Sequence, residues 1–204
     1  MTRNNSIPLA WLGLVALVTL WSAIAPHDRF TWWLETIPVF IAVAVLAATY
    51  RAFPLTPLLY GLIAIHAIIL LVGGHYTYAE VPAFNWLRDE FNLTRNYYDR
   101  VGHIAQGFIP ALVIRELLLR TSPLKSGKWL FAIVLFACLG ISAAYEIIEW
   151  QVAIWTGEAA ESFLGTQGDV WDTQQDMGMA LIGAVAGLLA LAGWHDKQLA
   201  KVAA

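Results

Sequence analysis

The sequence predicts an all-α membrane protein, a polytopic bundle of about six transmembrane helices that forms one integral membrane domain over residues 1–204. The first observation is composition: 59% of the 204 residues are hydrophobic and 13% are charged, whereas about 25% of the residues in an average soluble domain are charged. The second is length, because the apolar residues gather in stretches near the length of about 20 residues that a helix needs to cross a bilayer.

The six predicted spans are residues 8–25, 30–50, 57–74, 96–119, 129–155 and 172–194. We interpret the first as a transmembrane helix rather than a signal peptide. Arg3 is the only basic residue before it, and no small-residue cleavage site is followed by a soluble domain. Two polar residues interrupt the early spans. We interpret Glu35 as an acid that reaches water near a helix end, and His66 as a packing residue.

Residues 79–98 are too polar to span the membrane, yet Phe84, Leu87 and Phe91 recur at helical spacing. This pattern indicates either a short helix in the headgroup plane or a loop that packs as a lid on the helix ends. Both interpretations stay open, and both would cover the acidic residues described below.

The distribution of basic residues predicts the orientation. If the helices alternate in direction, one side receives Arg3, Arg51, Arg115, Arg120, Lys125, Lys128, Lys197 and Lys201, and the other receives Arg29, Arg88, Arg95 and Arg100. Cytoplasmic loops carry the excess of Lys and Arg. We therefore expect both termini in the cytoplasm and the loops after the first, third and fifth helices on the outside.

Three further features limit the partners. The sequence has no basic stripe that would indicate nucleic-acid binding. Cys138 is the single cysteine, so an intramolecular disulfide is impossible. Gly183 and Gly187 form a small-xxx-small pair that would let the last helix pack closely, either within the bundle or across a homodimer.

The acidic and histidine side chains are the main functional signal. Asp99 and His103 are four residues apart and share a helix face, although an N-cap with its partner would give the same spacing. Glu146 and Glu149 are three apart within a long apolar helix. Two such carboxylates repel each other unless one is protonated or a cation lies between them; exposure at a helix end is the alternative.

A third group leads into the last helix. Asp172 and Asp176 have the i,i+4 spacing of one helix face, and Asp169 lies just before them, where it would cap the helix. One acid is enough for a cap. The additional acids therefore favour a functional site on the outer side.

Together these pairs predict a divalent-metal site, because bundles build such sites from i,i+3 and i,i+4 ligands on neighbouring helices. Carboxylate and imidazole ligands without thiolate favour Zn²⁺, Mn²⁺ or Fe²⁺, with Mg²⁺ or Ca²⁺ as oxygen-rich alternatives. The expected metal ligands are His103, Glu146, Glu149, Asp172 and Asp176. Asp99 and Asp169 are expected as the catalytic base or as residues that support the ligands.

Such a site would hydrolyse or transfer a group on a lipid-linked envelope substrate. Arg95 and Arg100 would hold an anionic headgroup, and Tyr145 and His75 would support the site, since the glycines before His75 allow its ring to approach the acids. The alternative is a non-catalytic protein, embedded in membrane lipids, whose acids form a structural metal or hydrogen-bond lock.

The motifs also carry a resemblance. They are Gly-Gly-His-Tyr-Thr-Tyr at 73–78, Tyr-Asp-Arg-Val-Gly-His at 98–103, Tyr145-Glu146 with Glu149-Trp150, and Gly-Thr-Gln-Gly-Asp-Val-Trp-Asp-Thr-Gln at 165–174. Over nearly the whole chain these resemble the YjdF family of bacterial inner-membrane proteins. That resemblance implies the topology and an inner-membrane location, without catalytic residues. More distantly, the order Asp…His, Tyr-Glu and Asp…Asp before a glycine-bearing last helix is similar to the VanZ-type pattern, which implies an envelope role.

Overall fold

The computed structural model of the chain describes residues 6–157 and 161–202, and Arg3 lies outside this part. All regular elements in the described part are helices, and none is a strand. In chain order they are α1 (Ser6–Ala23), α2 (Arg29–Thr49), α3 (Pro57–Tyr76), α4 (Pro82–Glu90), α5 (Tyr98–Thr121), α6 (Lys128–Thr156), α7 (Glu161–Leu164) and α8 (Asp172–Val202). The all-α prediction is confirmed.

The long helices match the six predicted spans. Five of them, α2, α3, α5, α6 and α8, are long and apolar enough to cross a membrane, and α1 is a shorter apolar helix. The main difference is at the end of α8, which we predicted at Trp194 and which lies at Val202. The additional turns are polar, so hydropathy missed them. They stay helical because His195 is completely buried against α5.

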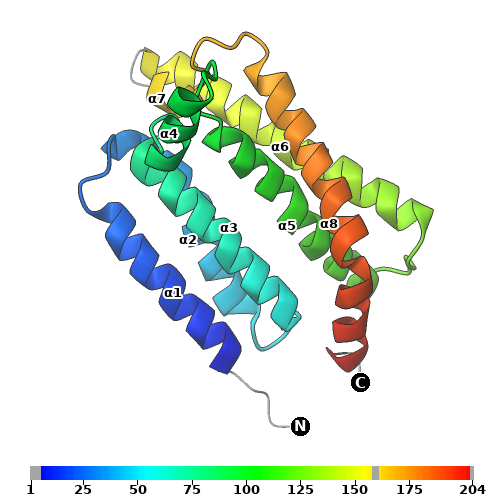
Figure 1. The fold of residues 1–204 in the computed structure, drawn as a ribbon. Helices are drawn as coiled ribbons and strands as arrows, with labels where there is room; N and C mark the ends of the chain where they lie inside the picture. Colours follow the sequence, from blue (N-terminus) through cyan, green and yellow to red (C-terminus); the bar gives the residue numbers. More distant parts are fainter. Residues whose placement is uncertain (1–5, 158–160, 203–204) are drawn as a thin grey trace.

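Close contact between α5 and α8 forms the centre of the bundle (Figure 1). Small residues permit it: a Cβ atom on Gly107 would collide with the backbone of α8 at Ala180, and one on Gly183 would collide with the backbone of α5 at Ile104. Gly187 likewise lies against Phe108. The small-residue pair of α8 is thus used inside the bundle, which removes it as evidence for a homodimer.

The remaining long helices surround this pair. Helix α3 packs on α5 and also carries α1 and α2, whereas α6 packs on both α5 and α8. The start of α1 and the end of α8 lie at one end of the bundle, and α4 and α7 lie at the other (Figure 1). This agrees with an even number of crossings and puts the starts of α5 and α8 at the same end.

Segment 79–98 contains the short helix α4, so the expectation of a short helix in this segment is confirmed. Its Phe84 ring meets the Tyr98 ring edge to face, with centroids 5.2 Å apart, while Trp86 on the same helix is 62% exposed. The expected cover over the acidic residues comes from more than one segment. Within the described residues, Phe163 and Leu164 of α7 line the cavity at the acidic site, and no residue of α4 does. Arg95, in the same segment 79–98, pairs with Asp172 and Asp99, so this segment and α7 both contact the acidic site.

A separate polar network holds the opposite end of the bundle. Glu116 of α5 is completely buried and accepts hydrogen bonds from Thr56 Oγ1 (2.9 Å) and Arg120 Nη1 (2.7 Å), and its Oε2 lies 2.8 Å from His195 Nε2. Arg115 Nη1 lies 3.0 Å from His195 Nδ1. Because a guanidinium only donates, His195 Nδ1 accepts, and the ring hydrogen is on Nε2, which donates a hydrogen bond to Glu116. This network joins the start of α3 to α5 and α8.

Candidate functional site

The starts of α5 and α8 bring the predicted acids together, and two arginines lie between them. Arg100 of α5 donates from Nη2 to Asp172 Oδ1 (2.7 Å) and from Nη1 to Asp99 Oδ2 (3.2 Å), and Nη1 also pairs with Asp176 Oδ1. The side chain of Arg100 is 6% exposed. A buried acid is costly unless it is paired. Arg100 therefore neutralises acids from both helices.

Arg95 plays a similar part just before α5. It pairs with Asp172 Oδ1 and donates to the backbone carbonyls of Gly165 (3.0 Å) and Thr166 (3.1 Å), so it also fixes the loop that enters α8. It is 4% exposed. We predicted that Arg95 and Arg100 bind an anionic headgroup. The structure contradicts this, because both guanidinium groups are buried and occupied by carboxylates of the chain.

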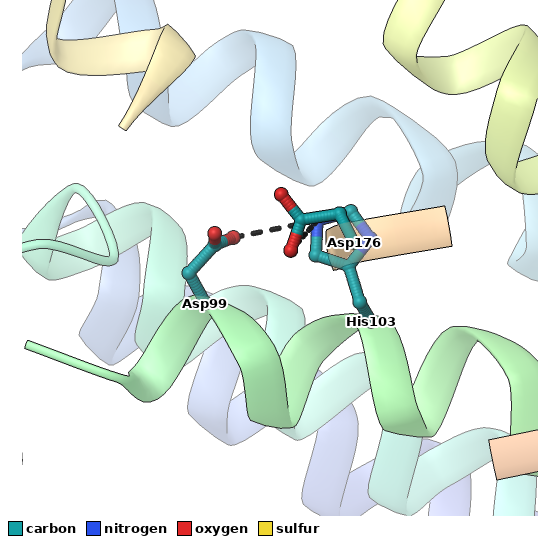
Figure 2. A group of neighbouring side chains, drawn as sticks. All are labelled: Asp99, His103 and Asp176. Atoms are coloured by element: carbon teal, nitrogen blue, oxygen red, sulfur yellow. Dashed lines mark ion pairs between the residues drawn. The ribbon is translucent and has the colours of Figure 1, made fainter. Parts of the chain in front are cut away.

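Within the described residues, Asp99, His103 and Asp176 form a group that could hold a metal ion. One ligand atom from each lies within 4.8 Å of the others. His103 Nε2 is 3.4 Å from Asp99 Oδ1 and 3.6 Å from Asp176 Oδ1. Figure 2 shows Asp99 and His103 side by side on α5, with Asp176 of α8 facing them. The i,i+4 spacing on α5 thus produces the shared face that the sequence predicted.

The orientation of His103 suits a ligand. Its Nδ1 lies 3.1 Å from Gln106 Oε1, an oxygen that can only accept, so Nδ1 carries a proton. In the neutral ring this leaves the lone pair on Nε2, which faces both aspartates. Metal-binding histidines commonly donate their other ring N–H in this way. Arg100 Nη1 pairs with Asp99 Oδ2 and with Asp176 Oδ1, the same oxygen that lies 3.6 Å from His103 Nε2.

The other predicted site residues lie around this group. Glu146 of α6 is 7% exposed, and its Oε1 has no hydrogen-bond partner in the described chain and lies 3.9 Å from His103 Nδ1. Asp169 accepts from Trp171 N (2.9 Å) and Gln175 Nε2 (2.9 Å), as a turn cap would. The metal-capable group therefore contains His103 and Asp176 of the five expected ligands, together with Asp99. Glu146, Glu149 and Asp172 are not part of it.

His75 does not reach the acids, contrary to our expectation. Its ring stacks on Trp21 with centroids 4.6 Å apart, and its Nδ1 lies 2.9 Å from the carbonyl oxygen of Ser22. The two glycines before it serve another purpose. The ring of Tyr78 occupies the space where Gly73 would carry a Cβ, and Gly74 lies against Glu35 and Thr36.

A cavity of about 190 Å³, lined in part by Asp99, His103 and Asp176, extends into the bundle between α2, α3, α5, α6, α7 and α8. Glu35 lines it and accepts from Tyr145 Oη (3.3 Å), and Glu149 and Tyr78 line it as well. We had interpreted Glu35 as an acid that reaches water, but it is buried. The sequence signal for Glu35 was an acidic residue within an apolar span. Tyr78 gave no signal, since it belongs to a loop.

Comparison with known proteins agrees with this membrane architecture. Residues 7–197 match a family model described as "Predicted membrane protein (DUF2238)". The chain is 49% identical over 185 residues to "Inner membrane protein YjdF" of Escherichia coli (strain K12), which covers 91% of this chain and 88% of that protein. No solved structure matches. This similarity supports an inner-membrane location. The chain therefore belongs to the DUF2238 family of predicted membrane proteins.

Proposed function

We propose that Asp99, His103 and Asp176 bind one divalent metal ion, and that the protein uses it to hydrolyse or transfer a group on a lipid-linked envelope substrate. The observation that carries this proposal is the convergence of two carboxylates and an imidazole on one point, with His103 Nδ1 directed to Gln106. A second observation is Glu146 Oε1, a buried oxygen that faces His103 and has no hydrogen-bond partner in the part of the chain that the structure describes. Such an unsatisfied buried group requires an explanation.

The chemistry of the ligands limits the ion. Two carboxylates and one imidazole suit Zn²⁺, Mn²⁺ or Fe²⁺, and Mg²⁺ would bind with additional water. Three protein ligands leave a coordination position for water or substrate, which is the arrangement of a catalytic rather than a structural site. The ion would supply an activated water for attack on an ester. Glu146 is our candidate for the group that accepts its proton.

Location and orientation belong to the same proposal. The positive-inside distribution supports cytoplasmic termini, so the end of the bundle that carries α4 and α7 would face outward. The metal site would then lie at the outer leaflet, where lipid-linked envelope intermediates are available. The partners of the site are membrane lipids and a lipid-linked substrate.

Metal content is the direct test. The full chain, purified in a mild detergent without chelator, is analysed by inductively coupled plasma mass spectrometry for Zn, Mn, Fe and Mg. We expect stoichiometric metal in the wild type and strong loss in His103→Ala and Asp176→Asn. Asp169→Asn is the matched control, since Asp169 lies in the same acidic cluster but outside the three-residue group, and it should keep its metal. Metal-free wild type overturns the proposal.

The second candidate is a structural lock, which one specific observation favours. Arg95 and Arg100 already neutralise Asp99, Asp172 and Asp176 without any ion. The lock requires only that these ion pairs join α5 to α8. Wild-type protein without metal, combined with loss of folding in Arg100 variants, would favour it over the metal site.

A further inference from the structure

The cavity that Asp99, His103 and Asp176 line also contains two acids without a counter-ion among the described residues. Glu35 is 6% exposed, and Glu149 is half-buried. Within the described residues, neither forms an ion pair with Arg, Lys or His, in contrast to Asp99 and Asp176, which pair with Arg100. Two buried carboxyl groups at one cavity are unfavourable when nothing positive balances them. An ionised carboxylate at this cavity would therefore need a cation that the described residues do not supply.

Neutral donors complete the environment of Glu35. It accepts a hydrogen bond from Tyr145 Oη at 3.3 Å, and the hydroxyl of Tyr78 is a second donor. Burial raises the pKa of Tyr78 above its ordinary value, so its hydroxyl keeps its proton. Phenol groups orient a carboxylate without cancelling its charge. Glu35 is thus held in place and remains available to a cation.

The structure places Tyr78 at this cavity by unusual backbone geometry. Thr77 and Tyr78 both have left-handed backbone conformations, with φ of 55° and 53°, which residues other than glycine seldom adopt. The Tyr78 ring fills space left by Gly73 on α3 and Gly102 on α5, where a Cβ would collide with it. Local strain of this kind commonly accompanies functional sites. The Gly-Gly-His-Tyr-Thr-Tyr motif therefore serves to put one phenol into the cavity.

The size and lining of the cavity select a class of ligand. About 190 Å³ is many times the roughly 10–15 Å³ that one water needs on the same measure, so there is room for a small organic group. Aromatic rings, namely Tyr78, Tyr145 and Phe163, share the lining with Glu35 and Glu149. Aromatic faces together with carboxylates are the chemistry that recognises ammonium groups. His66 Nε2, a buried atom with no hydrogen-bond partner among the described residues, adds an unused polar atom.

We propose that this cavity binds an organic ammonium group, with Glu35 and Glu149 as its counter-ions and the Tyr78 and Tyr145 rings around it. Such a group is present both in an ethanolamine lipid headgroup and in a free small amine. This inference does not depend on the metal ion, and it replaces the anionic headgroup that the sequence suggested. Arg95 and Arg100, the cations expected to bind an anion, do not line this cavity.

The test uses the full chain in lipid nanodiscs of phosphatidylglycerol, and it measures the thermal unfolding midpoint as ethanolamine is added. A ligand that binds only the folded state raises this midpoint by mass action. Ethylene glycol and ammonium chloride are the ligand controls. We expect ethanolamine alone to raise the midpoint, with at least a tenfold weaker apparent affinity in Glu35→Gln and in Glu149→Gln. Glu90→Gln, an exposed acid of α4, is the matched control and should behave as the wild type.

A second arm distinguishes the source of the ammonium. If the lipid is the ligand, nanodiscs of phosphatidylethanolamine should raise the midpoint by themselves and abolish the response to free ethanolamine. If a free amine is the ligand, the response should persist in those discs.

Tyr78→Phe is the fallback variant if Glu35→Gln does not fold. It keeps the ring and both carboxylates, and it should weaken ethanolamine binding. An equal response to ammonium chloride, no response to ethanolamine in either disc, or unchanged affinity in the carboxamide variants overturns the proposal. Metal content, measured in parallel, reports separately on the metal site.

Discussion

Arg100 of α5 and Asp172 of α8 form a buried ion pair, with Nη2 2.7 Å from Oδ1 and side chains that are 6% and 8% exposed. The same guanidinium also contacts Asp99 and Asp176. The acids of α8 therefore depend on a cation from α5. This relationship joins the folding of the bundle to the geometry of the candidate metal site.

Arg100→Leu should reduce the free energy of unfolding by about 3–5 kcal/mol, because removal of one partner leaves buried charges uncompensated. Arg100→Lys should recover part of this loss, since it restores the charge without the two-pronged donor geometry. Unfolding in detergent, followed by circular dichroism, measures both. Arg88→Gln, which breaks an exposed pair with Asp89, is the control and should have no measurable effect. Equal stability of Arg100→Leu and the wild type would contradict the role given to Arg100.

Gly107→Ala should separate α5 from α8, because the new Cβ meets the carbonyl oxygen of Ala180. Insertion of a methyl group into a packed interface typically costs about 1–3 kcal/mol, and here the obstacle is backbone, which yields little. Gly178→Ala is the matched control on α8, since a Cβ there meets nothing within 4 Å. It should be neutral or stabilising, because alanine favours a helix. Similar unfolding midpoints for the two variants would show that the contact is less close than described.

Glu116→Ala should destabilise the opposite end of the bundle by about 3–5 kcal/mol, because Arg120 and its hydrogen-bonding neighbours would lose a buried charged partner. Metal content per folded chain should not change, since Glu116 lies at the other end from the candidate site. Asp196→Asn is the control: this side chain is 51% exposed in its pair with Arg115, and the change should cost less than about 1 kcal/mol. Loss of metal in folded Glu116→Ala would reveal coupling between the two ends.

The N-cap of α2 predicts a simple pH dependence. Asp28 Oδ1 accepts from Thr31 N (2.6 Å), and this backbone hydrogen bond lowers the pKa of Asp28 below its usual 3.8. The cap therefore stabilises the protein fully above the ordinary pKa and is lost as the pH falls through the lowered value. Asp28→Ala should cost about 1 kcal/mol at neutral pH. Unfolding measured at several pH values should show this difference shrink in acid; a constant difference contradicts the assignment.

The long helices were predictable because hydropathy reports helix length directly, whereas the polar end of α8 and the short helix α7 escaped it. The site was predictable in part. The spacing of Asp99 and His103 placed them on one face, but the sequence offered no means to see that Arg95 and Arg100, rather than an ion, would lie against Asp172. Contacts across helices depend on packing, and the packing here depends on glycines whose neighbours a sequence does not name. For the same reason Glu35 and Tyr78 were not recognised as cavity residues.

The orientation of the bundle remains a prediction, and single cysteines can test it in cells. Cys138 is completely buried and should not react with a membrane-impermeant maleimide, so it serves as an internal background. Asp89→Cys, on exposed α4, should react in intact cells, because the distribution of basic residues predicts that this end is outside. Lys125→Cys, in the exposed loop between α5 and α6, should react only after the membrane is permeabilised. The reverse pattern would put the acids of α5 and α8 in the cytoplasm, and a substrate at the outer leaflet would then be out of reach.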